Sequence, residues 1–257
     1  MIDRQDLKYI KNILELHNKD VDLNDIYEIM TALKEDDALT FYSKMFSLDY
    51  KIDTKYLLKV LTAAKEHPDV ERSLFDSFSD NQIGAKYALL DAVDELRILN
   101  EESTVVIWGA WYGSILIPAL QNKVQKIFAM DVDESPLKIA KNRLFPDYGN
   151  VEYVCDDVFN RCLKSYKVAD LIINTSCEHM RPMKECEWFN AERNRYINEN
   201  CWFAFQSNNM FGIEGHVNCV NGMNEFKSQL PINSKVYFEE EVEDTRGKRY
   251  MLVGKLY

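Results

Sequence analysis

Two titratable side chains stand next to each other after a short apolar run in the second half of the chain. Glu178 and His179 follow the run 171–173, and these are the residue types that most often exchange a proton with a substrate near neutral pH. Asn174, at the end of the run, adds an amide that can orient a ligand. We therefore take this segment as the candidate catalytic site. A Glu–His pair at a strand end can also cap the next helix or form an ion pair.

A glycine turn occurs earlier in the chain. An apolar run, 105–108, ends at a turn from Gly109 to Gly113, and an apolar helical pattern follows. Such a turn brings backbone N–H groups and the positive end of a helix dipole toward a ligand above a sheet. Asp131 ends the next run, where a carboxylate can accept hydrogen bonds from both hydroxyls of a ribose. The two features predict a nucleoside-cofactor site, although a short glycine turn alone is also typical of an ordinary tight connection.

These candidate residues follow β-type runs that alternate with helix-length connections. The runs are 105–108, 126–130, 151–154, 171–173, 202–206, 236–241 and 250–256. The alternation predicts parallel pairing, and the last two runs, joined near Gly247, predict an antiparallel hairpin. The predicted fold class is α/β, with a Rossmann-like, seven-stranded, mostly parallel sheet that ends in a C-terminal antiparallel hairpin.

The first part of the chain has a different pattern. From residue 3 to about residue 99 the apolar residues recur with helical spacing and glycine is almost absent, which predicts five or six packed helices. One of them is expected over 82–96. We predict two domains, an all-helical N-terminal cap at 1–99 and a cofactor-binding domain at 100–257.

Residues 104–257 resemble the class I S-adenosylmethionine-dependent methyltransferases in the order and spacing of their motifs, and their sheet also closes with a hairpin. The first hundred residues match no family pattern. The resemblance implies that S-adenosylmethionine is the cofactor and that the following residues bind it: Gly109, Ala110, Trp111, Tyr112, Gly113, Asp131, Val132, Asp157, Val158 and Asn174. One departure is the pair of bulky aromatics between the two glycines. Trp111 and Tyr112 either close over the cofactor or pack beneath the cap.

The resemblance also implies that the methyl acceptor lies at the strand ends beside the cofactor. Glu178, His179 and Asn174 are then the catalytic candidates, and the acceptor is expected to contact Gln82, Lys86, Ser176, Asn208 and His216. The asparagine-rich segment after run 202–206 predicts a polar pocket, unless its amides stabilise only their own turns. Lys86 is equally typical of a solvated helix residue.

The predicted activity is methyl transfer to a small polar molecule or a side chain. One alternative is an aminocarboxypropyl transferase of the nicotianamine-synthase kind, which uses the same cofactor, and another is a non-catalytic cofactor-binding protein. A nicotinamide-dependent dehydrogenase is a weaker competitor, because Asp131 would also suit the ribose of NAD.

Composition narrows the classes of partner. The 257 residues carry a formal charge of −11 and a pI near 5.0, which disfavours duplex nucleic acid. No run is long and apolar enough for a membrane span, and the polar N-terminus does not read as a secretory signal, so we expect a cytoplasmic protein. The six cysteines show no zinc-ligand spacing, and a site from Cys177, His179, His216 and Cys219 is disfavoured, so no metal is predicted. The sequence indicates no oligomeric state.

Overall fold

The computed structural model describes residue 12 and residues 54–159, 167–186, 197–198, 200–231, 234–244 and 246–256. The chain divides into two compact units, Met1–Ile83 with Asn142–Leu144, and Gly84–Lys141 with Phe145–Tyr257. This division falls inside helix α6, Asp80–Glu95. The predicted domain boundary after residue 99 stays a prediction.

The described part of the first unit is helical. It contains α4 (Thr54–Glu66), α5 (Glu71–Asp76) and the beginning of α6. The rings of Tyr56 and Phe78 meet edge to face with their centroids 6.2 Å apart, and Asn12 Nδ2 donates to the Phe78 carbonyl at 2.9 Å. Helix α6 corresponds to the helix predicted over 82–96. The helices predicted for residues 3–53 lie outside the described residues, apart from Asn12.

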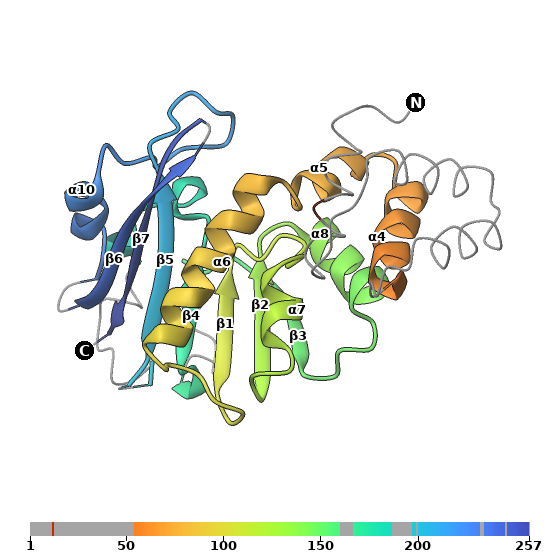
Figure 1. Ribbon diagram of the computed structural model, residues 1–257, viewed down its shortest axis with the longest axis horizontal. Coiled ribbons are helices and arrows are strands. Elements are labelled where there is room, and N and C mark those ends of the chain that lie inside the picture. Colours follow the sequence, from red (N-terminus) through yellow and green to blue (C-terminus); the bar gives the residue numbers. More distant parts are fainter. Residues whose placement is uncertain are drawn as a thin grey trace. The chain divides into compact units, whose positions relative to one another are not determined.

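The second unit is built on one seven-stranded sheet (Figure 1). Its order is β3-β2-β1-β4-β5-β7-β6, and β7 is the only strand that runs opposite to the other six. The predicted seven strands and closing hairpin are therefore confirmed. The strands are β1 (Thr104–Trp108), β2 (Lys126–Asp131), β3 (Val151–Cys155), β4 (Leu171–Asn174), β5 (Trp202–Asn208), β6 (Lys235–Asp244) and β7 (Gly247–Lys255).

The central strands form because their side chains are apolar on both faces. Every residue of β1 and β4 is buried, which is typical of parallel strands covered on both sides. Trp108 stacks on Phe205 with ring centroids 5.9 Å apart, and each such fully buried side chain contributes about 1.5–3 kcal/mol. The described connections contain α7 (Leu116–Leu120), α8 (Glu134–Ile139), η1 (Ala140–Leu144), η3 (Cys177–His179), η4 (Met183–Glu185) and α10 (Met223–Ser228).

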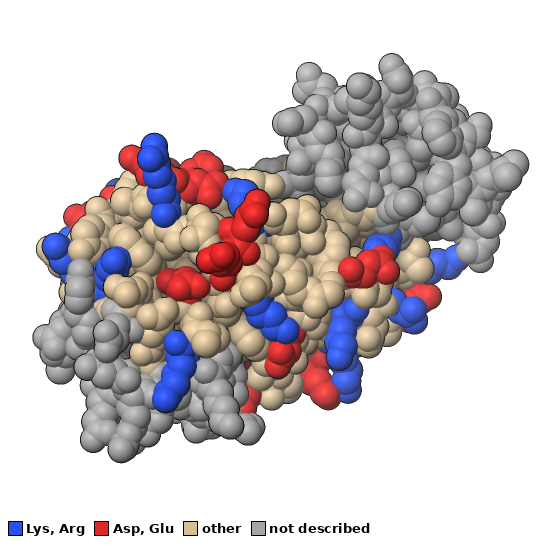
Figure 2. Space-filling model, turned by 90° about the horizontal axis from the view of Figure 1, so that it is seen from below, with Lys and Arg blue, Asp and Glu red and all other residues tan. Residues whose placement is uncertain are grey.

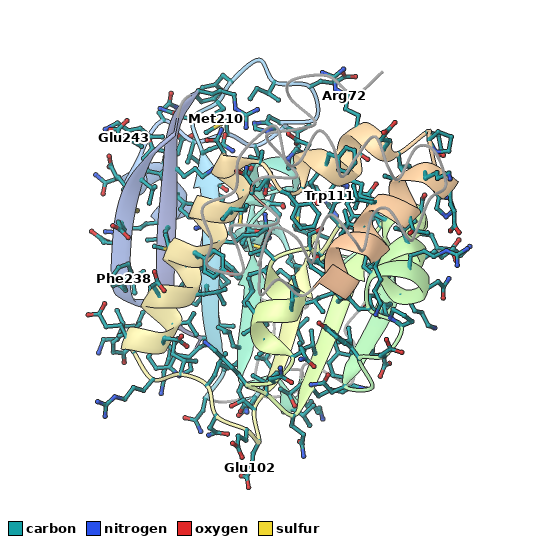
Figure 3. The ribbon with its side chains drawn as sticks, turned by 45° about the vertical axis from the view of Figure 1, so that its right-hand side comes forward. Arg72, Glu102, Trp111, Met210, Phe238 and Glu243 are labelled. Atoms are coloured by element: carbon teal, nitrogen blue, oxygen red, sulfur yellow. The ribbon has the colours of Figure 1, made fainter. Side chains whose placement is uncertain are left out.

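The register brings the carboxyl ends of the inner strands to one edge. Trp108 pairs with Met130 and with Asn174, and Asn174 pairs with Phe205. Figure 3 shows the result, because Trp111 after β1 and Met210 after β5 lie at the same end of the sheet. Glu102, which precedes β1, lies at the opposite end. The loops that follow β1, β2, β4 and β5 are therefore placed to form one site.

Helix α6 lies along one face of the sheet (Figure 1). Its Ala85 carbonyl accepts a hydrogen bond from Nε2 of the buried Gln206, in β5, at 2.7 Å. This bond joins the helix to the strand whose end carries the predicted polar pocket. It places the neighbouring Lys86 on the helix segment that contacts β5.

The charge distribution can be followed on the surface seen in Figure 2. Basic and acidic side chains are interspersed on this face. Its described residues therefore offer no broad basic area that could bind the phosphate backbone of a nucleic acid. Among the described helices, none combines the length and apolarity of a membrane span.

Candidate functional site

The loop after β1 turns sharply because three of its residues adopt the left-handed backbone conformation. Gly109 and Gly113 have φ of +61°, and Trp111 has φ of +51°. A Cβ on Gly109 would lie 2.8 Å from Cε of Met180, and one on Gly113 would overlap the Ile117 side chain. Trp111 has no such freedom, and its conformation costs about 1–2 kcal/mol. Contacts from outside the loop must offset this cost.

Those contacts come from the end of β2. The Ala110 N–H donates to the Met130 carbonyl at 2.8 Å, and the Trp111 N–H donates to Asp131 Oδ2 at 2.7 Å. Asp131 Oδ1 accepts from the Asp133 N–H at 3.0 Å. A carboxylate has about four lone-pair sites, so both oxygens retain acceptor capacity. Asp131 thus supports the glycine turn and stays half-buried with a fixed orientation.

The helix expected after this turn is present but short. Helix α7 begins at Leu116 and has five residues, so it sums too few peptide dipoles to provide the expected positive helix end. The apolar residues of this helical pattern are buried, as Ile115, Leu116 and Ile117 are all at most 2% exposed. The backbone of the turn itself is what remains for binding a ligand. Tyr112 is buried, and its ring centroid lies 5.1 Å from that of the half-buried Trp111.

The loops after β2 and β3 are joined. The Asp156 N–H donates to the Asp131 carbonyl at 3.0 Å, and Asp157 Oδ1 accepts from the Phe159 N–H at 2.8 Å. Val158 is 5% exposed and packs in the core, whereas Val132 is 69% exposed. The two predicted valines therefore differ, because Val132 presents an apolar side chain at the surface next to Asp131 and Val158 does not.

Asn174 organises the loop after β4. It is fully buried, its Oδ1 accepts from the Ser176 N–H at 2.9 Å, and its Nδ2 lies 3.3 Å from Met180 Sδ. The methyl group of Met180 lies against Gly109, and Ser176 Cβ is also near it. Both ends of this amide are therefore engaged within the loop, and the loop packs on the glycine turn.

Glu178 is buried in the short helix η3. Its backbone carbonyl accepts from the N–H groups of Val217 and Asn218, both at 2.9 Å, so the segment after β5 covers it. Oε1 lies 3.8 Å from Nη1 of the buried Arg249, and Oε2 has no hydrogen-bond partner among the described residues. Burial raises the pKa of the Glu178 carboxyl above its usual value, and the Arg249 guanidinium lowers it in part.

His179 and His216 come together although 36 residues separate them in the sequence. Their ring centroids are 4.6 Å apart and the rings are nearly perpendicular, at 86°. His179 is exposed, and its Nδ1 lies 3.0 Å from the Gly215 carbonyl. Because a carbonyl only accepts, Nδ1 carries the proton and Nε2 keeps its lone pair. Burial, then the neighbouring His179, lowers the pKa of His216.

The end of β5 contributes unpaired polar groups. Ser207 and Asn208 are fully buried, and neither Ser207 Oγ nor Asn208 Nδ2 has a hydrogen-bond partner in the described part of the chain. Asn208 Oδ1 accepts from the Met210 N–H at 2.9 Å and from the Cys219 thiol at 3.3 Å. Asn208 thus has an orphaned donor and stays a candidate for binding a ligand.

The two residues of α6 that were predicted to contact the methyl acceptor belong to different units. Lys86 belongs to the second unit and lies close enough to Glu178 to lower the pKa of that carboxyl. Gln82 belongs to the first unit, so its predicted contact with an acceptor stays a prediction.

Arg249 and Gly215 belong to this site although neither was predicted from the sequence. Arg249 reaches Glu178 because it pairs with Asn208 across β5 and β7, a register that no local pattern encodes. Gly215 has φ of +82°, and a Cβ there would lie 3.4 Å from His179 Nδ1. A glycine directly before a histidine in a polar loop was the available signal.

The chain resembles known proteins in its fold and not in its sequence. No protein-family model matches this sequence, and no curated protein matches it. Among solved structures, a Leishmania major S-adenosylmethionine-dependent methyltransferase is 14% identical and superposes with a TM-score of 0.55, covering 83% of this chain and 90% of that chain.

Two further solved structures are similar. The N-methyltransferase NodS from Bradyrhizobium japonicum, in complex with S-adenosylhomocysteine, is 12% identical with a TM-score of 0.55, over 79% of this chain and 98% of that one. A putative methyltransferase from Bacillus halodurans is 13% identical with a TM-score of 0.51, over 65% and 97% respectively. At such identities the likeness shows the fold alone. The chain has the Rossmann-like fold of the class I S-adenosylmethionine-dependent methyltransferases.

Proposed function

We propose that this protein is an S-adenosylmethionine-dependent methyltransferase that acts on a small polar molecule or a side chain. The observation that carries the proposal is the position of Asp131 at the end of β2, with its carboxylate oriented by the N–H groups of Trp111 and Asp133. This carboxylate has lone pairs left for the two ribose hydroxyls. The fold shared with methyltransferases, one of them holding S-adenosylhomocysteine, supports the same conclusion.

The residues at this edge fit the cofactor. A turn with left-handed glycines allows close approach to its backbone, the exposed Val132 offers an apolar surface for the adenine ring, and Asp157 offers an acceptor for its amino group. We assign the methionine end to Gly109, Ala110, Trp111, Tyr112, Gly113 and Asn174, the ribose to Asp131, and the adenine to Val132 and Asp157. Val158 packs in the core, so we assign it to supporting the adenine-binding loop from below.

The bound cofactor supplies an electrophilic methyl group on a sulfonium, and the protein must hold the acceptor in line with it. His179 is the better candidate for removing a proton from the acceptor, because its Nε2 has a lone pair and the side chain is exposed. Glu178 is almost fully buried next to Arg249, so we assign it to positioning. Asn174 shapes the loop that carries both residues.

Unpaired polar groups support a polar acceptor. Asn208 Nδ2 and Ser207 Oγ are buried donors without partners among the described residues, and a ligand with oxygen acceptors would satisfy them. Ser176, Lys86, His216 and Asn208 are the acceptor contacts that we propose, with Gln82 as a further candidate.

Isothermal titration calorimetry with S-adenosylhomocysteine tests the cofactor assignment. We expect Asp131→Ala to weaken binding at least tenfold, about 1.4 kcal/mol for the loss of charge-assisted contacts. Glu134→Gln is the matched control, because Glu134 is exposed and its carboxylate forms an ion pair with Lys138 on the surface of α8. Thermal melting of each variant checks that it is folded. Binding of NAD without S-adenosylhomocysteine, or unchanged affinity in the Asp131 variant, would refute the assignment.

Product analysis tests the group that is transferred. A methyltransferase leaves S-adenosylhomocysteine, whereas an aminocarboxypropyl transferase leaves methylthioadenosine. Incubation with S-adenosylmethionine and pools of candidate acceptors, followed by mass spectrometry, separates the two activities. Tight binding without either product from any acceptor pool would favour a non-catalytic cofactor-binding protein.

A further inference from the structure

Three potential metal ligands converge beside the predicted acceptor position. One carboxylate oxygen of Glu178 and one ring nitrogen from each of His179 and His216 all lie within 4.8 Å of one another. We call these three residues the Glu–His–His cluster. It differs from the cysteine-containing set that the sequence analysis disfavoured, because the third member is the buried carboxylate and not a thiol.

The hydrogen bonds of the two rings leave the same nitrogen available on each. His179 donates its Nδ1 proton to the Gly215 carbonyl, as described above. His216 Nδ1 lies 3.5 Å from Cys219 Sγ, and the Cys219 thiol proton is directed to Asn208 Oδ1 at 3.3 Å. The sulfur can then accept from His216 Nδ1–H, and in that tautomer both histidines keep the lone pair on Nε2. Metal-bound histidines usually have their other nitrogen held in this way.

The carboxylate also has an uncommitted atom. Glu178 is 3% exposed, and its Oε2 has no hydrogen-bond partner among the described residues. Arg249 approaches the other oxygen, with Nη1 3.8 Å from Oε1, so it offsets part of the buried charge without occupying Oε2. A buried carboxylate oxygen without a partner is costly. A cation bound at Oε2 would satisfy it.

The donor set indicates which ion fits. Imidazole nitrogens favour first-row transition metals, whereas Mg²⁺ and Ca²⁺ prefer oxygen ligands. Two histidines and one carboxylate leave further coordination positions open for water or a substrate. We propose that Glu178, His179 and His216 bind one divalent first-row transition-metal ion.

The role of this ion rests on the proposed function. The cluster follows β4 and β5 at the edge where the acceptor is placed, so the ion would coordinate an oxygen or nitrogen atom of the acceptor. Coordination lowers the pKa of a bound hydroxyl, so that its proton would be released to bulk water. The Nε2 lone pair of His179 cannot bind the ion and accept a proton at the same time. The ion would therefore take the place of His179 in activating the acceptor.

Titration of the full chain with Mn²⁺ and Co²⁺, after removal of metals with a chelator, tests the proposal. We expect one ion per chain, measured from the loss of the electron paramagnetic resonance signal of free Mn²⁺ and from the visible absorption of bound Co²⁺. His179→Gln, His216→Gln and Glu178→Gln should each weaken binding by at least about 100-fold, because even supporting residues of a metal site change affinity by 10–100-fold. His179 is exposed, so its variant should fold even if the Glu178 variant does not.

His67→Gln is the matched control, since His67 lies in the first unit, outside the cluster. Cys219→Ser should retain Mn²⁺ binding within a few fold, because serine can make the same hydrogen bonds. Absence of binding by the wild type, equal losses in His179→Gln and His67→Gln, or loss of binding in Cys219→Ser would overturn the assigned ligand set. The proposed function fails on a different measurement, the binding of S-adenosylhomocysteine, so the two outcomes are distinguishable.

Discussion

Gly113→Ala is the substitution whose effect the structure defines most closely. Gly113 has φ of +61°, a conformation that costs a residue with a Cβ about 1–2 kcal/mol. The new Cβ would also overlap the side chain of Ile117, which is fully buried and β-branched and so has little rotamer freedom. Overpacking of this kind costs about 1–3 kcal/mol. We expect a total loss of roughly 2–5 kcal/mol in the free energy of unfolding.

Urea unfolding followed by tryptophan fluorescence measures this loss. The three described tryptophans, Trp108, Trp111 and Trp202, lie in β1, in the loop after it and in β5, so their signal reports the unfolding of the sheet. With a slope of about 2 kcal/mol per molar urea, the midpoint should fall by roughly 1–2.5 M. Gly149→Ala is the matched control, because Gly149 has no left-handed φ and no atom within 4 Å of a Cβ. It should change stability by no more than about 0.5 kcal/mol. Equal midpoints for the two variants would show that the turn is not strained as described.

Two further predictions use the same reasoning. Gly84→Ala should stabilise the protein by about 0.5–1 kcal/mol, because alanine favours the helix more than glycine does. Gly84 is exposed within α6, and no atom lies within 4 Å of the new Cβ. A lower urea midpoint in the variant would contradict this prediction. Iodoacetamide at mildly alkaline pH should label the exposed Cys155 in the folded protein but not the buried Cys177. Burial raises the pKa of the Cys177 thiol, and the nearby Glu178 carboxylate raises it further. The thiol therefore stays protonated and unreactive. Tryptic peptide mapping checks the second prediction, and equal labelling of both thiols would show that Cys177 is accessible.

The sheet was predictable because its central strands are short, rich in β-branched or aromatic residues, and apolar on both faces. The run 171–173 differs from β4 by one residue, and the last two runs pair as the expected hairpin. The helix after Gly113 was less predictable. A short apolar segment that packs against a sheet is buried whether or not it is helical, so its composition does not determine the length of the helix. Helix α7 has five residues, a length that the sequence pattern does not specify.

The members of the candidate site were predictable singly but not as a group. Glu178 and His179 were visible as a titratable pair, yet a glutamate beside a histidine gave no sign that one would be buried and the other exposed. Burial of Glu178 arises when the segment after β5 folds over it, through the N–H groups of Val217 and Asn218. Arg249 joins from the hairpin, 71 positions further along the chain. These contacts depend on strand order and register, which appear only in the folded chain.

The glycine turn shows how a departure from the family pattern can be accommodated. Trp111 occupies a left-handed position where small residues are usual, and its N–H donates to Asp131 Oδ2 at 2.7 Å. A hydrogen bond to a charged group contributes about 1.5–3 kcal/mol, which is enough to offset the 1–2 kcal/mol that the backbone conformation costs. Asp131 therefore has two functions, because the carboxylate that we assign to the ribose also maintains the turn that we assign to the methionine end.

Loss of cofactor affinity in Asp131→Ala would then combine both effects, and Trp111→Gly separates them. Glycine adopts the left-handed conformation without support. Relative to Trp111→Gly alone, the added Asp131 substitution should therefore weaken cofactor binding through the ribose contact and no longer through strain at residue 111.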